Sequence, residues 1–379
     1  MTGPAGGALR LAMLAGANSA HSWRWMDYFA QRGHEVHWIS LVPFPRTPRP
    51  ELSTYEVPVA PAGVLGLIRA GRAVRRILAE IRPQLLHVHS VGTYGVVGAL
   101  SGGRPMVATA WGSDVLITAR APGKRIAIRG VLRRAEVVTC DALHMREALL
   151  RLGVPPAKIR VIYFGTDPTR FRPGVDGSHV RARFGLGEGP VIISLRSLEP
   201  IYDVATLIRA MPTVVRDAPQ ARCLVVGDGS ERPALESLVR SLGLMETVRL
   251  AGAVPADEIP AFLAAADIYV STARSDAGLA ASTAEAMAAA LPVVVTACAE
   301  NHLWVAEGKG GYLVPLGDAE ALARGILDLA HQPDLRKAFG AYNRQVIEER
   351  NNYFREMAKI EQLYQEVAAP RCAADGARP

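Results

Sequence analysis

Cysteine, aromatic residues and long apolar runs are all scarce in this 379-residue chain, and each scarcity excludes a class of protein. The four cysteines are far apart and form no Cys-x-x-Cys pair, which supports neither a disulfide framework nor a zinc knuckle and is typical of a reducing compartment. Aromatic residues make up 6% and are not interleaved with the clustered basic residues, which argues against nucleic acid as a partner. With 49% hydrophobic and 21% charged residues, the chain is expected to form a globular protein of two domains.

Two apolar stretches resemble targeting or membrane segments without meeting their requirements. Residues 8–20 contain the small residues of a signal-peptide cleavage site, but the apolar run is short and includes Arg10. We interpret it as a buried first strand. Residues 277–299 carry one charge, Glu285, over a length that could cross a bilayer, but Pro292 interrupts them and most are small. They are expected to form a buried loop, helix and strand in a cytoplasmic protein.

The net charge of +7 is divided unevenly along the chain. Residues 1–177 contain 23 Lys and Arg against 11 Asp and Glu, a charge of +12, whereas the remainder carries −5. This asymmetry favours two domains and an anionic partner for the first half. Many of the basic residues recur every three or four positions within two predicted helices: Arg69, Arg72, Arg75 and Arg76 in one, and Lys124, Arg125, Arg129, Arg133 and Arg134 in the other. A solvated surface, docking on the inner face of an anionic membrane and an anionic acceptor are the interpretations left open.

Short apolar runs alternate with longer segments of helical periodicity almost throughout, which predicts an α/β fold with a parallel sheet in each half. The strands are expected at Leu9–Leu14, Glu35–Ile39, Leu85–His89, Met106–Ala110, Glu136–Thr139, Arg160–Ile162, Val191–Leu195, Cys223–Val226, Val248–Leu250, Asp267–Ser271 and Val293–Thr296. The segment Gly165–Gly189, with frequent glycine and proline, is the predicted linker. We expect an N-terminal domain over residues 1–177, a C-terminal domain over 178–350, and over 351–379 a helix that packs back toward the N-terminal domain, followed by a tail.

In open parallel sheets, ligands bind beyond the carboxyl ends of the strands, which points to the loops after the predicted strands. Gly16 follows the first strand, where a small residue lets backbone amides approach a phosphate, although many such turns need a glycine only to turn. His21 could contact a sugar or cap the following helix. Trp111 and Asp114 follow another strand of this half, and Asp114 could orient a hydroxyl or act as a base.

Two strands of the C-terminal half are also followed by candidate ligand-binding residues. Gly227 and Gly229 follow a strand, but Arg232 stands where a dinucleotide fingerprint needs its third glycine. A nicotinamide-dependent dehydrogenase is therefore not indicated, and these glycines predict a tight turn near a ligand. Arg196 comes directly after the first strand of this half, where its guanidinium could clamp a diphosphate or form an ordinary surface ion pair.

The most informative block is SDAGLAASTAEAMAAALPVVVT, residues 275–296. Gly278 lies in a predicted loop, and a helix is expected to start at Ser282. Ser282 and Glu285 have capping-box spacing, so Glu285 could simply accept a backbone hydrogen bond. The free amides of this helix start could also bind a diphosphate, with the carboxylate on a ribose diol, and the two roles are compatible. The sequence contains no pattern spaced like a metal site, a Ser-His-Asp triad or a Walker loop.

Together these blocks resemble a family-four retaining glycosyltransferase of the GT-B superfamily, over about residues 9–367. The order and spacing of the motifs carry the resemblance, and they include LHVHS, TAWGSDV, KIRVIYFGTDPTRFRP, LRSLEPIYDVATLIRA, LVVGDGSERPALE, STARSDAG and AEAMAAALPVVVT. The resemblance implies two Rossmann-like domains that face a central cleft, with the acceptor bound by the first and a nucleotide-diphospho-sugar, usually UDP-linked, by the second. It implies retaining transfer of a hexose or N-acetylhexosamine to a hydroxyl, without metal or other cofactor, in polysaccharide, glycolipid or natural-product biosynthesis. The Ala-, Arg- and Gly-rich composition is typical of a GC-rich bacterial genome.

The resemblance also assigns roles to individual residues. Arg196 is expected to bind phosphate and Glu285, as the second glutamate of the family's E-x7-E motif, to bind the ribose, and both are expected to be catalytic together with Asp114. The other expected donor-binding residues are Gly16, Tyr202, Gly227, Val254, Asp276, Gly278, Leu279, Ala280 and Ser282. The expected acceptor-binding residues are His21, Trp111 and Asp114.

Several positions depart from the family's pattern. Ala277 stands where the first glutamate is expected, with Asp276 beside it as a candidate substitute. Tyr202 lies where a second phosphate-binding cation, a lysine, is expected, and Trp111 replaces a histidine. These departures leave two alternatives open: a non-catalytic GT-B partner of another glycosyltransferase, and a sugar-nucleotide 2-epimerase, for which Asp114 is the one candidate acid or base.

Overall fold

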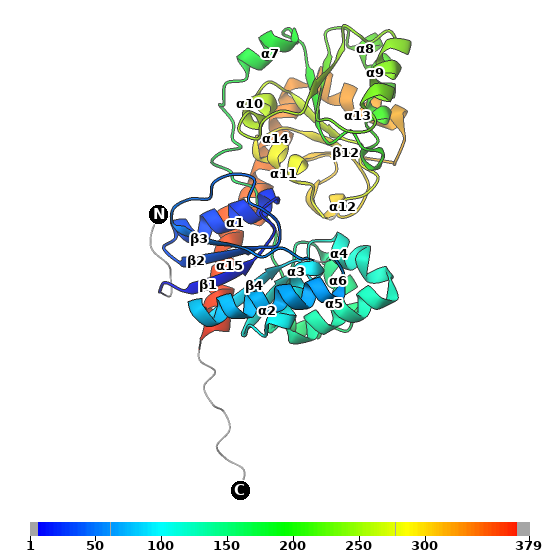
Figure 1. Cartoon of the computed structure of the whole chain (residues 1–379). Helices are drawn as coiled ribbons and strands as arrows, with labels where there is room; N and C mark the ends of the chain where they lie inside the picture. Colours follow the sequence, from blue (N-terminus) through cyan, green and yellow to red (C-terminus); the bar gives the residue numbers. More distant parts are fainter. Residues whose placement is uncertain (1–6, 61, 277, 370–379) are drawn as a thin grey trace. The chain divides into compact units, whose positions relative to one another are not determined.

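The structure, a computed structural model, describes residues 7–60, 62–276 and 278–369 (Figure 1). The chain divides into two compact units, an N-terminal unit of Met1–Tyr163 with Glu356–Pro379 and a C-terminal unit of Phe164–Arg355. The first division therefore falls 14 residues before the expected boundary at 177/178. The segment predicted as a linker lies within the C-terminal unit and contains a helix, α7 (Ser178–Phe184).

The N-terminal unit is built on a seven-stranded parallel sheet in the order β3-β2-β1-β4-β5-β6-β7. Its strands are β1 (Arg10–Leu14), β2 (Glu35–Ser40), β3 (Leu52–Glu56), β4 (Leu85–His89), β5 (Met106–Thr109), β6 (Val137–Cys140) and β7 (Ile159–Val161). The first strand pairs with β2 on one side and β4 on the other, and four of its five residues are buried. The interpretation of residues 8–20 as a buried first strand is confirmed.

Helices cover both faces of this sheet (Figure 1). They are α1 (Ala20–Gln31), α2 (Val64–Ile81), α3 (Thr93–Ser101), α4 (Ser113–Leu116), α5 (Pro122–Arg134), α6 (Leu143–Arg151) and α15 (Tyr353–Ala368). Side chains alternate between faces along each strand, so Leu86 and Val88 of β4 join an apolar core with α2, α3 and α5. The opposite face, which includes His87 and His89, lies against α1 and α15. This face carries the polar side chains that matter below.

The last helix, α15, is held in the N-terminal unit by both rings and charges. The Tyr364 ring stacks on Phe29 of α1 at 4.9 Å between centroids. The buried carboxylate of Glu361 lies 3.0 Å from His34 Nε2 and 3.2 Å from Arg32 Nη2. A buried carboxylate is tolerated where it has such partners, and these contacts fix α15 beside α1.

The C-terminal unit is a second parallel α/β sandwich, with a six-stranded sheet in the order β10-β9-β8-β11-β12-β13. The strands are β8 (Val191–Leu195), β9 (Arg222–Val226), β10 (Val248–Gly252), β11 (Ile268–Ser271), β12 (Val293–Thr296) and β13 (Gly311–Val314). Besides α7, the helices are α8 (Val204–Asp217), α9 (Arg232–Ser241), α10 (Ile259–Ala264), α11 (Ala281–Ala288), α12 (Asn301–Trp304), α13 (Ala319–His331) and α14 (Pro333–Arg350). The prediction of a parallel α/β sheet in each half is confirmed.

The apolar stretch of residues 277–299 forms a helix and a strand of this unit, as predicted, with Ala277 outside the described residues. Its strand β12 is entirely buried in the sheet. Within the described ranges, no helix combines the length and apolar character needed to cross a membrane.

Candidate functional site

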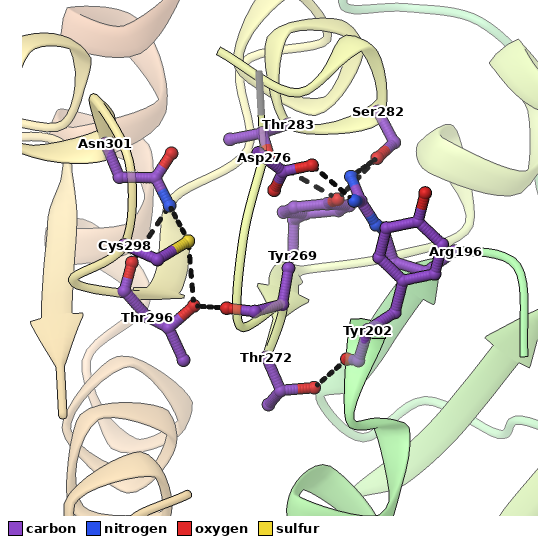
Figure 2. A network of polar contacts seen from close by, with 11 residues as sticks. Arg196, Tyr202, Tyr269, Thr272, Asp276, Ser282, Thr283, Thr296, Cys298 and Asn301 are labelled. Atoms are coloured by element: carbon purple, nitrogen blue, oxygen red, sulfur yellow. Dashed lines mark hydrogen bonds and ion pairs between the residues drawn. The ribbon is translucent and has the colours of Figure 1, made fainter. Parts of the chain in front are cut away.

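Arg196 lies at the first residue beyond β8, at the carboxyl edge of the C-terminal sheet, and its guanidinium is nearly buried (Figure 2). Its Nη2 donates to Asp276 Oδ1 at 2.6 Å, and its Nη1 donates to Ser282 Oγ at 3.4 Å. Side-chain exposure is 8% for Arg196 and 11% for Asp276. A cation this deeply buried needs such partners, and here they come from the loop before α11 and from α11 itself.

Tyr202 lies flat against the same guanidinium, with Arg196 Cζ 4.1 Å from its ring centroid (Figure 2). The main chain at Tyr202 is held by Thr272, whose Oγ1 donates to the Tyr202 carbonyl oxygen at 3.0 Å. Burial lowers the pKa of Arg196, but the neighbouring Tyr269 and Asp276 oppose it and the balance raises the pKa. Tyr202 stands where a second cation is expected. Its ring instead packs on Arg196 and helps to hold that guanidinium in place.

Tyr269 ties the start of α11 to the sheet. Its hydroxyl lies 2.8 Å from Ser282 Oγ and accepts from Thr283 Oγ1 at 3.4 Å. Tyr269 was not predicted as a site residue. Its place on a strand puts its side chain at the same edge of the sheet as the loop after β8. The first turn of α11 is held by contacts of the Ser282 hydroxyl with Tyr269 and Arg196 (Figure 2).

The helix α11 begins at Ala281, one residue before the predicted start, so Ser282 is not its N-cap. Its N-cap is Ala280, which has no side chain able to accept a hydrogen bond. Ser282 is already inside the helix, with its hydroxyl on Tyr269 and Arg196. The backbone N–H groups of residues 281–283 have no acceptor within the helix, so the first turn presents donors and a positive dipole end beside Arg196. Glu285, partly exposed, follows on the next turn.

Only one of the two carboxylate oxygens of Asp276 contacts Arg196. Its Oδ1 pairs with Arg196, whereas Oδ2 is buried and has no hydrogen-bond partner among the described residues. Burial raises the pKa of Asp276 despite the opposing charge of Arg196. The second oxygen is thus a free acceptor at the arginine, beside the loop that contains Gly278, whose φ of +129° suits a residue without a side chain.

Gly227 brings the loop after β9 against the loop after β8. At its φ of +138°, a Cβ atom would lie 2.0 Å from the carbonyl oxygen of Arg196. Only glycine fits this close approach, as predicted for a tight turn. Val254 lies two residues beyond β10 at the same edge of the sheet and is partly buried. The C-terminal unit therefore brings together most of the predicted donor-binding residues, including Leu279 and Ala280 just before α11.

In the N-terminal unit, Asp114 has a different role from the predicted base. Its Oδ1 accepts from the backbone N–H groups of Trp111 and Val115 at 3.1 and 3.0 Å. Its Oδ2 accepts from Ser90 Oγ and the Val91 N–H at 3.0 and 2.9 Å. A carboxylate offers about four lone-pair sites, and all of these are occupied. Asp114 therefore orders the loops after β4 and β5 and positions Trp111, and the role predicted for it on a hydroxyl or a proton stays a prediction.

Trp111 and His21 lie against each other, with ring centroids 5.2 Å apart, and both are partly exposed. Burial, followed by the charge of Arg24, lowers the pKa of His21 to about 4, so this imidazole is neutral at pH 7. Gly16 lies after β1, where a Cβ would approach Asn18 Oδ1 to 2.8 Å and the Tyr94 hydroxyl to 3.1 Å. The structure thus groups His21 and Trp111, and it places Gly16 beyond β1, which β4 separates from the strand before Trp111.

Beneath His21 and Trp111 lie residues that the sequence analysis quoted only as part of the motif LHVHS. His87 and His89 of β4 point to the same face of the sheet, and Trp25 of α1 packs edge-on against both. The signal that could have found them is the strand period itself, since two histidines separated by one residue share a face. Across the described parts of the chain, no group of three His, Cys, Asp or Glu side chains is arranged to hold a metal ion.

The two parallel-sheet α/β units, with an arginine and a helix start gathered at the carboxyl edge of the second sheet, define the class as the GT-B fold. The GT-B structure of Anabaena HepE, solved with UDP and glucose, superposes with a TM-score of 0.77 at 20% identity, covering 94% of this chain and 99% of that one. Residues 180–346 match the family described as "Glycosyl transferases group 1" and residues 19–170 match "Glycosyltransferase Family 4". The chain therefore belongs to the GT-B glycosyltransferases.

Two curated relatives share the similarity over most of their length. The GDP-mannose-dependent alpha-(1-6)-phosphatidylinositol monomannoside mannosyltransferase of Mycolicibacterium smegmatis is 29% identical over 281 residues, which cover 72% of this chain and 73% of that protein. The N-acetyl-alpha-D-glucosaminyl L-malate synthase of Bacillus anthracis is 25% identical over 352 residues, covering 89% and 91%. The first is named as a mannosyltransferase and the second as the synthase of a glucosaminyl malate.

Proposed function

We propose that this protein transfers a hexosyl or N-acetylhexosaminyl group from a nucleotide-diphospho-sugar, first of all a UDP-linked one, to a hydroxyl acceptor. The reaction retains the anomeric configuration and uses the nucleotide-sugar as co-substrate without a metal or another cofactor. The observation that carries the proposal is Arg196, held by Tyr202 and Asp276 beside the uncapped first turn of α11.

A departing nucleoside diphosphate needs its negative charge stabilised as the bond to the sugar breaks. The guanidinium of Arg196 has five N–H donors, of which one is directed to Asp276 and one to Ser282. The remaining donors, together with the amides of residues 281–283, are the groups that would bind the phosphate oxygens. These donors are fixed before the substrate arrives, so little reorganisation is needed when charge develops. In the mechanism implied by the family, the same diphosphate helps to remove the proton of the acceptor hydroxyl.

Two carboxylates complete the proposed donor site. Glu285, on the second turn of α11, would accept hydrogen bonds from the ribose diol. The free Oδ2 of Asp276 would accept a hydrogen bond from a hydroxyl of the donor sugar, which compensates for Ala277 at the position expected for a glutamate. Val254, Gly278, Leu279 and Ala280 would line the nucleotide and the sugar.

The experiment that tests this function is a donor screen by mass spectrometry, with product formation and free nucleotide both measured. UDP-glucose, UDP-N-acetylglucosamine and GDP-mannose are the first donors to compare, because one solved relative was bound to UDP and glucose and one curated relative is named GDP-mannose-dependent. We expect turnover of one donor, insensitive to EDTA and abolished in Glu285→Ala. The control is Arg216→Ala, an exposed arginine of α8. Wild-type protein that consumes none of the donors would contradict the proposal and favour the non-catalytic partner.

The sugar-nucleotide 2-epimerase alternative is disfavoured by the geometry of Asp114. It is the one candidate acid or base that the sequence offers for that reaction, and both of its carboxylate oxygens are already engaged by four protein donors. A product with an epimerised sugar on the same nucleotide, detected in the donor screen, would restore this alternative.

We also propose that the protein is cytoplasmic and that its N-terminal unit docks on the inner face of an anionic membrane through α2 and α5. Apolar side chains are exposed in both helices, at 72% for Val64, 64% for Leu65 and 73% for Ile126. Exposed Arg72 and Arg76 follow on α2. Arginine next to exposed aliphatic side chains suits a lipid interface. Charge reversal at Arg72 and Arg76 should abolish pelleting with phosphatidylglycerol vesicles, and unchanged pelleting would reject the docking.

A further inference from the structure

The hydroxyl of Tyr269 lies at the first turn of α11, next to Ser282, and the proposed function gives it no task (Figure 2). Tyr269 belongs to β11 and is fully buried, at 0% exposure. Burial raises the pKa of this hydroxyl, so the group keeps its proton at neutral pH. A tyrosine hydroxyl is both a donor and an acceptor, and in a buried position both need partners.

The partners of Tyr269 fix the direction of its hydrogen bonds. Thr283 Oγ1 donates to the Tyr269 oxygen at 3.4 Å. The hydrogen of the phenol then needs an acceptor, and within the described residues Ser282 Oγ, at 2.8 Å, provides it. The opposite direction, with Ser282 as the donor, would leave the buried hydrogen of Tyr269 unpaired, which is energetically unfavourable. We therefore assign the donor role to Tyr269.

Ser282 Oγ also accepts a hydrogen bond from Arg196 Nη1, at 3.4 Å. A guanidinium has donors only, so this contact has one possible direction. A hydroxyl oxygen has two lone pairs, and Tyr269 and Arg196 occupy both of them. The hydrogen of Ser282 itself remains free among the described residues. Asp276 does not accept it, because Oδ1 of that carboxylate pairs with Arg196 and Oδ2 has no hydrogen-bond partner there.

The free hydrogen of Ser282 lies where the proposed function places the diphosphate. Ser282 is partly exposed, whereas Tyr269 and Thr283 are buried. It is the second residue of α11, among the backbone N–H groups of residues 281–283, and its oxygen contacts the guanidinium of Arg196. A hydroxyl that donates to an anionic oxygen forms a short and strong hydrogen bond. Because Tyr202 stands in place of a second cation, such a neutral donor supplements the single arginine.

We propose that Tyr269 is a positioning residue of the donor site. By donating to Ser282 Oγ, it turns the hydrogen of Ser282 toward the diphosphate, and this serine hydroxyl binds an oxygen of the departing nucleotide. The inference rests on the proposed function for the presence of a diphosphate, and it adds a pair of coupled hydroxyls to the groups that bind it. Tyr269 does not touch the substrate, and neither hydroxyl transfers its proton.

The test is a double-mutant cycle, measured by calorimetric titration of UDP, or of GDP if that nucleotide binds more tightly. Tyr269→Phe keeps the buried ring and removes its hydroxyl, Ser282→Ala removes the hydrogen assigned to the phosphate, and the double variant completes the cycle. Tyr312→Phe is the matched control for the tyrosine, because its hydroxyl, on β13 of the same unit, donates to Asp328. Ser237→Ala, an exposed position of α9, is the control for the serine. Thermal unfolding confirms that each variant is folded.

We expect Ser282→Ala to raise the Kd of the nucleotide about tenfold, because a hydrogen bond to a charged group is lost. Tyr269→Phe should raise the Kd less, by about threefold, because the serine hydroxyl is still present but is no longer oriented. In the Ser282→Ala background, Tyr269→Phe should have no further effect on the Kd. Both controls should bind the nucleotide as the wild type does. A tyrosine that only supported the fold would have the same effect with and without the serine hydroxyl.

An unchanged Kd in Ser282→Ala, or an equal effect of Tyr269→Phe in both backgrounds, would overturn the inference. The expected pattern of affinities in a protein that consumes no donor would contradict the proposed function alone. Turnover of a donor with wild-type kcat in both Tyr269→Phe and Ser282→Ala would contradict this inference alone. A wild-type protein that binds neither nucleotide would contradict both.

Discussion

Removing the positive charge of Arg196 should weaken nucleotide binding, but the single substitution changes more than one interaction. In Arg196→Ala, the carboxylate of Asp276, 11% exposed, loses its cation and stays beside the phosphate site. Breaking a buried pair in this way costs up to about 3–5 kcal/mol of folding stability. The variant that isolates the phosphate contact is therefore the double substitution Arg196→Ala with Asp276→Asn, which removes both charges.

The magnitude follows from the donors that the guanidinium has left. Hydrogen bonds to a charged group contribute about 1.5–3 kcal/mol, which corresponds to an increase of about 10- to 150-fold in the Kd for the nucleoside diphosphate. In the single variant the loss should be larger, because an unpaired Asp276 also repels the diphosphate. Asp276→Asn alone should leave UDP binding equal or tighter, since it frees Arg196, while it lowers sugar transfer.

Calorimetric titration of UDP and GDP into the wild type and these variants measures the effect, with Arg216→Ala as the control arginine of the same unit. A double variant that binds the preferred nucleotide as tightly as the wild type does would refute the phosphate contact assigned to Arg196. A single Arg196→Ala variant that binds more tightly than the double variant would contradict the repulsion assigned to Asp276.

Three further predictions concern single groups. Gly227→Ala should destabilise the C-terminal unit and displace Arg196, because the added Cβ would overlap the Arg196 carbonyl oxygen. Thermal unfolding measures the stability, and UDP titration measures the effect on Arg196. Wild-type behaviour in either measurement would contradict the close approach. Tyr202→Phe should keep the UDP affinity, because the ring alone packs on the guanidinium. Tyr202→Ala should weaken UDP binding by about 0.5–2 kcal/mol. Equal Kd values for the two variants would reject the role of the ring. In the folded protein the pKa is lowered to about 4 for His21 and to about 3 for His89. Below about pH 6.5 the unfolded chain therefore takes up protons before the folded protein does. Folding stability should be complete above that pH and should fall as the pH drops toward 4. Urea unfolding at pH 7 and pH 5 measures this, and His89→Phe should reduce the difference; an identical pH dependence in that variant would be the contrary result.

Periodicity was sufficient to predict the parallel sheets and most strands, because both faces of such sheets are buried and their strands are continuous apolar runs. The edge strand β3 was missed because its sequence, LSTYE, is largely exposed and contains no apolar run. The linker prediction failed at α7, where Gly177 and Gly185 flank the helix. Those glycines mark the ends of an element, and composition alone does not distinguish this from a flexible connection.

In the candidate site, the sequence predicted which residues gather but not how they contact one another. Arg196 and Asp276 are 80 positions apart, and their pairing depends on the neighbouring positions of β8 and β11 in the sheet. The capping-box spacing of Ser282 and Glu285 was misleading, because Tyr269 engages the serine hydroxyl from another strand. The four backbone and hydroxyl partners of Asp114 come from loops after two different strands, and they were not visible in the sequence.

The most direct test of the central claim is a crystal structure of this protein with UDP, or with GDP if that nucleotide binds more tightly. We expect diphosphate oxygens about 3 Å from the guanidinium of Arg196 and from the amides of residues 281–283, with the ribose at Glu285. A nucleotide bound elsewhere, with Arg196 still engaged by Asp276 and Glu285 turned away from the ribose, would contradict it.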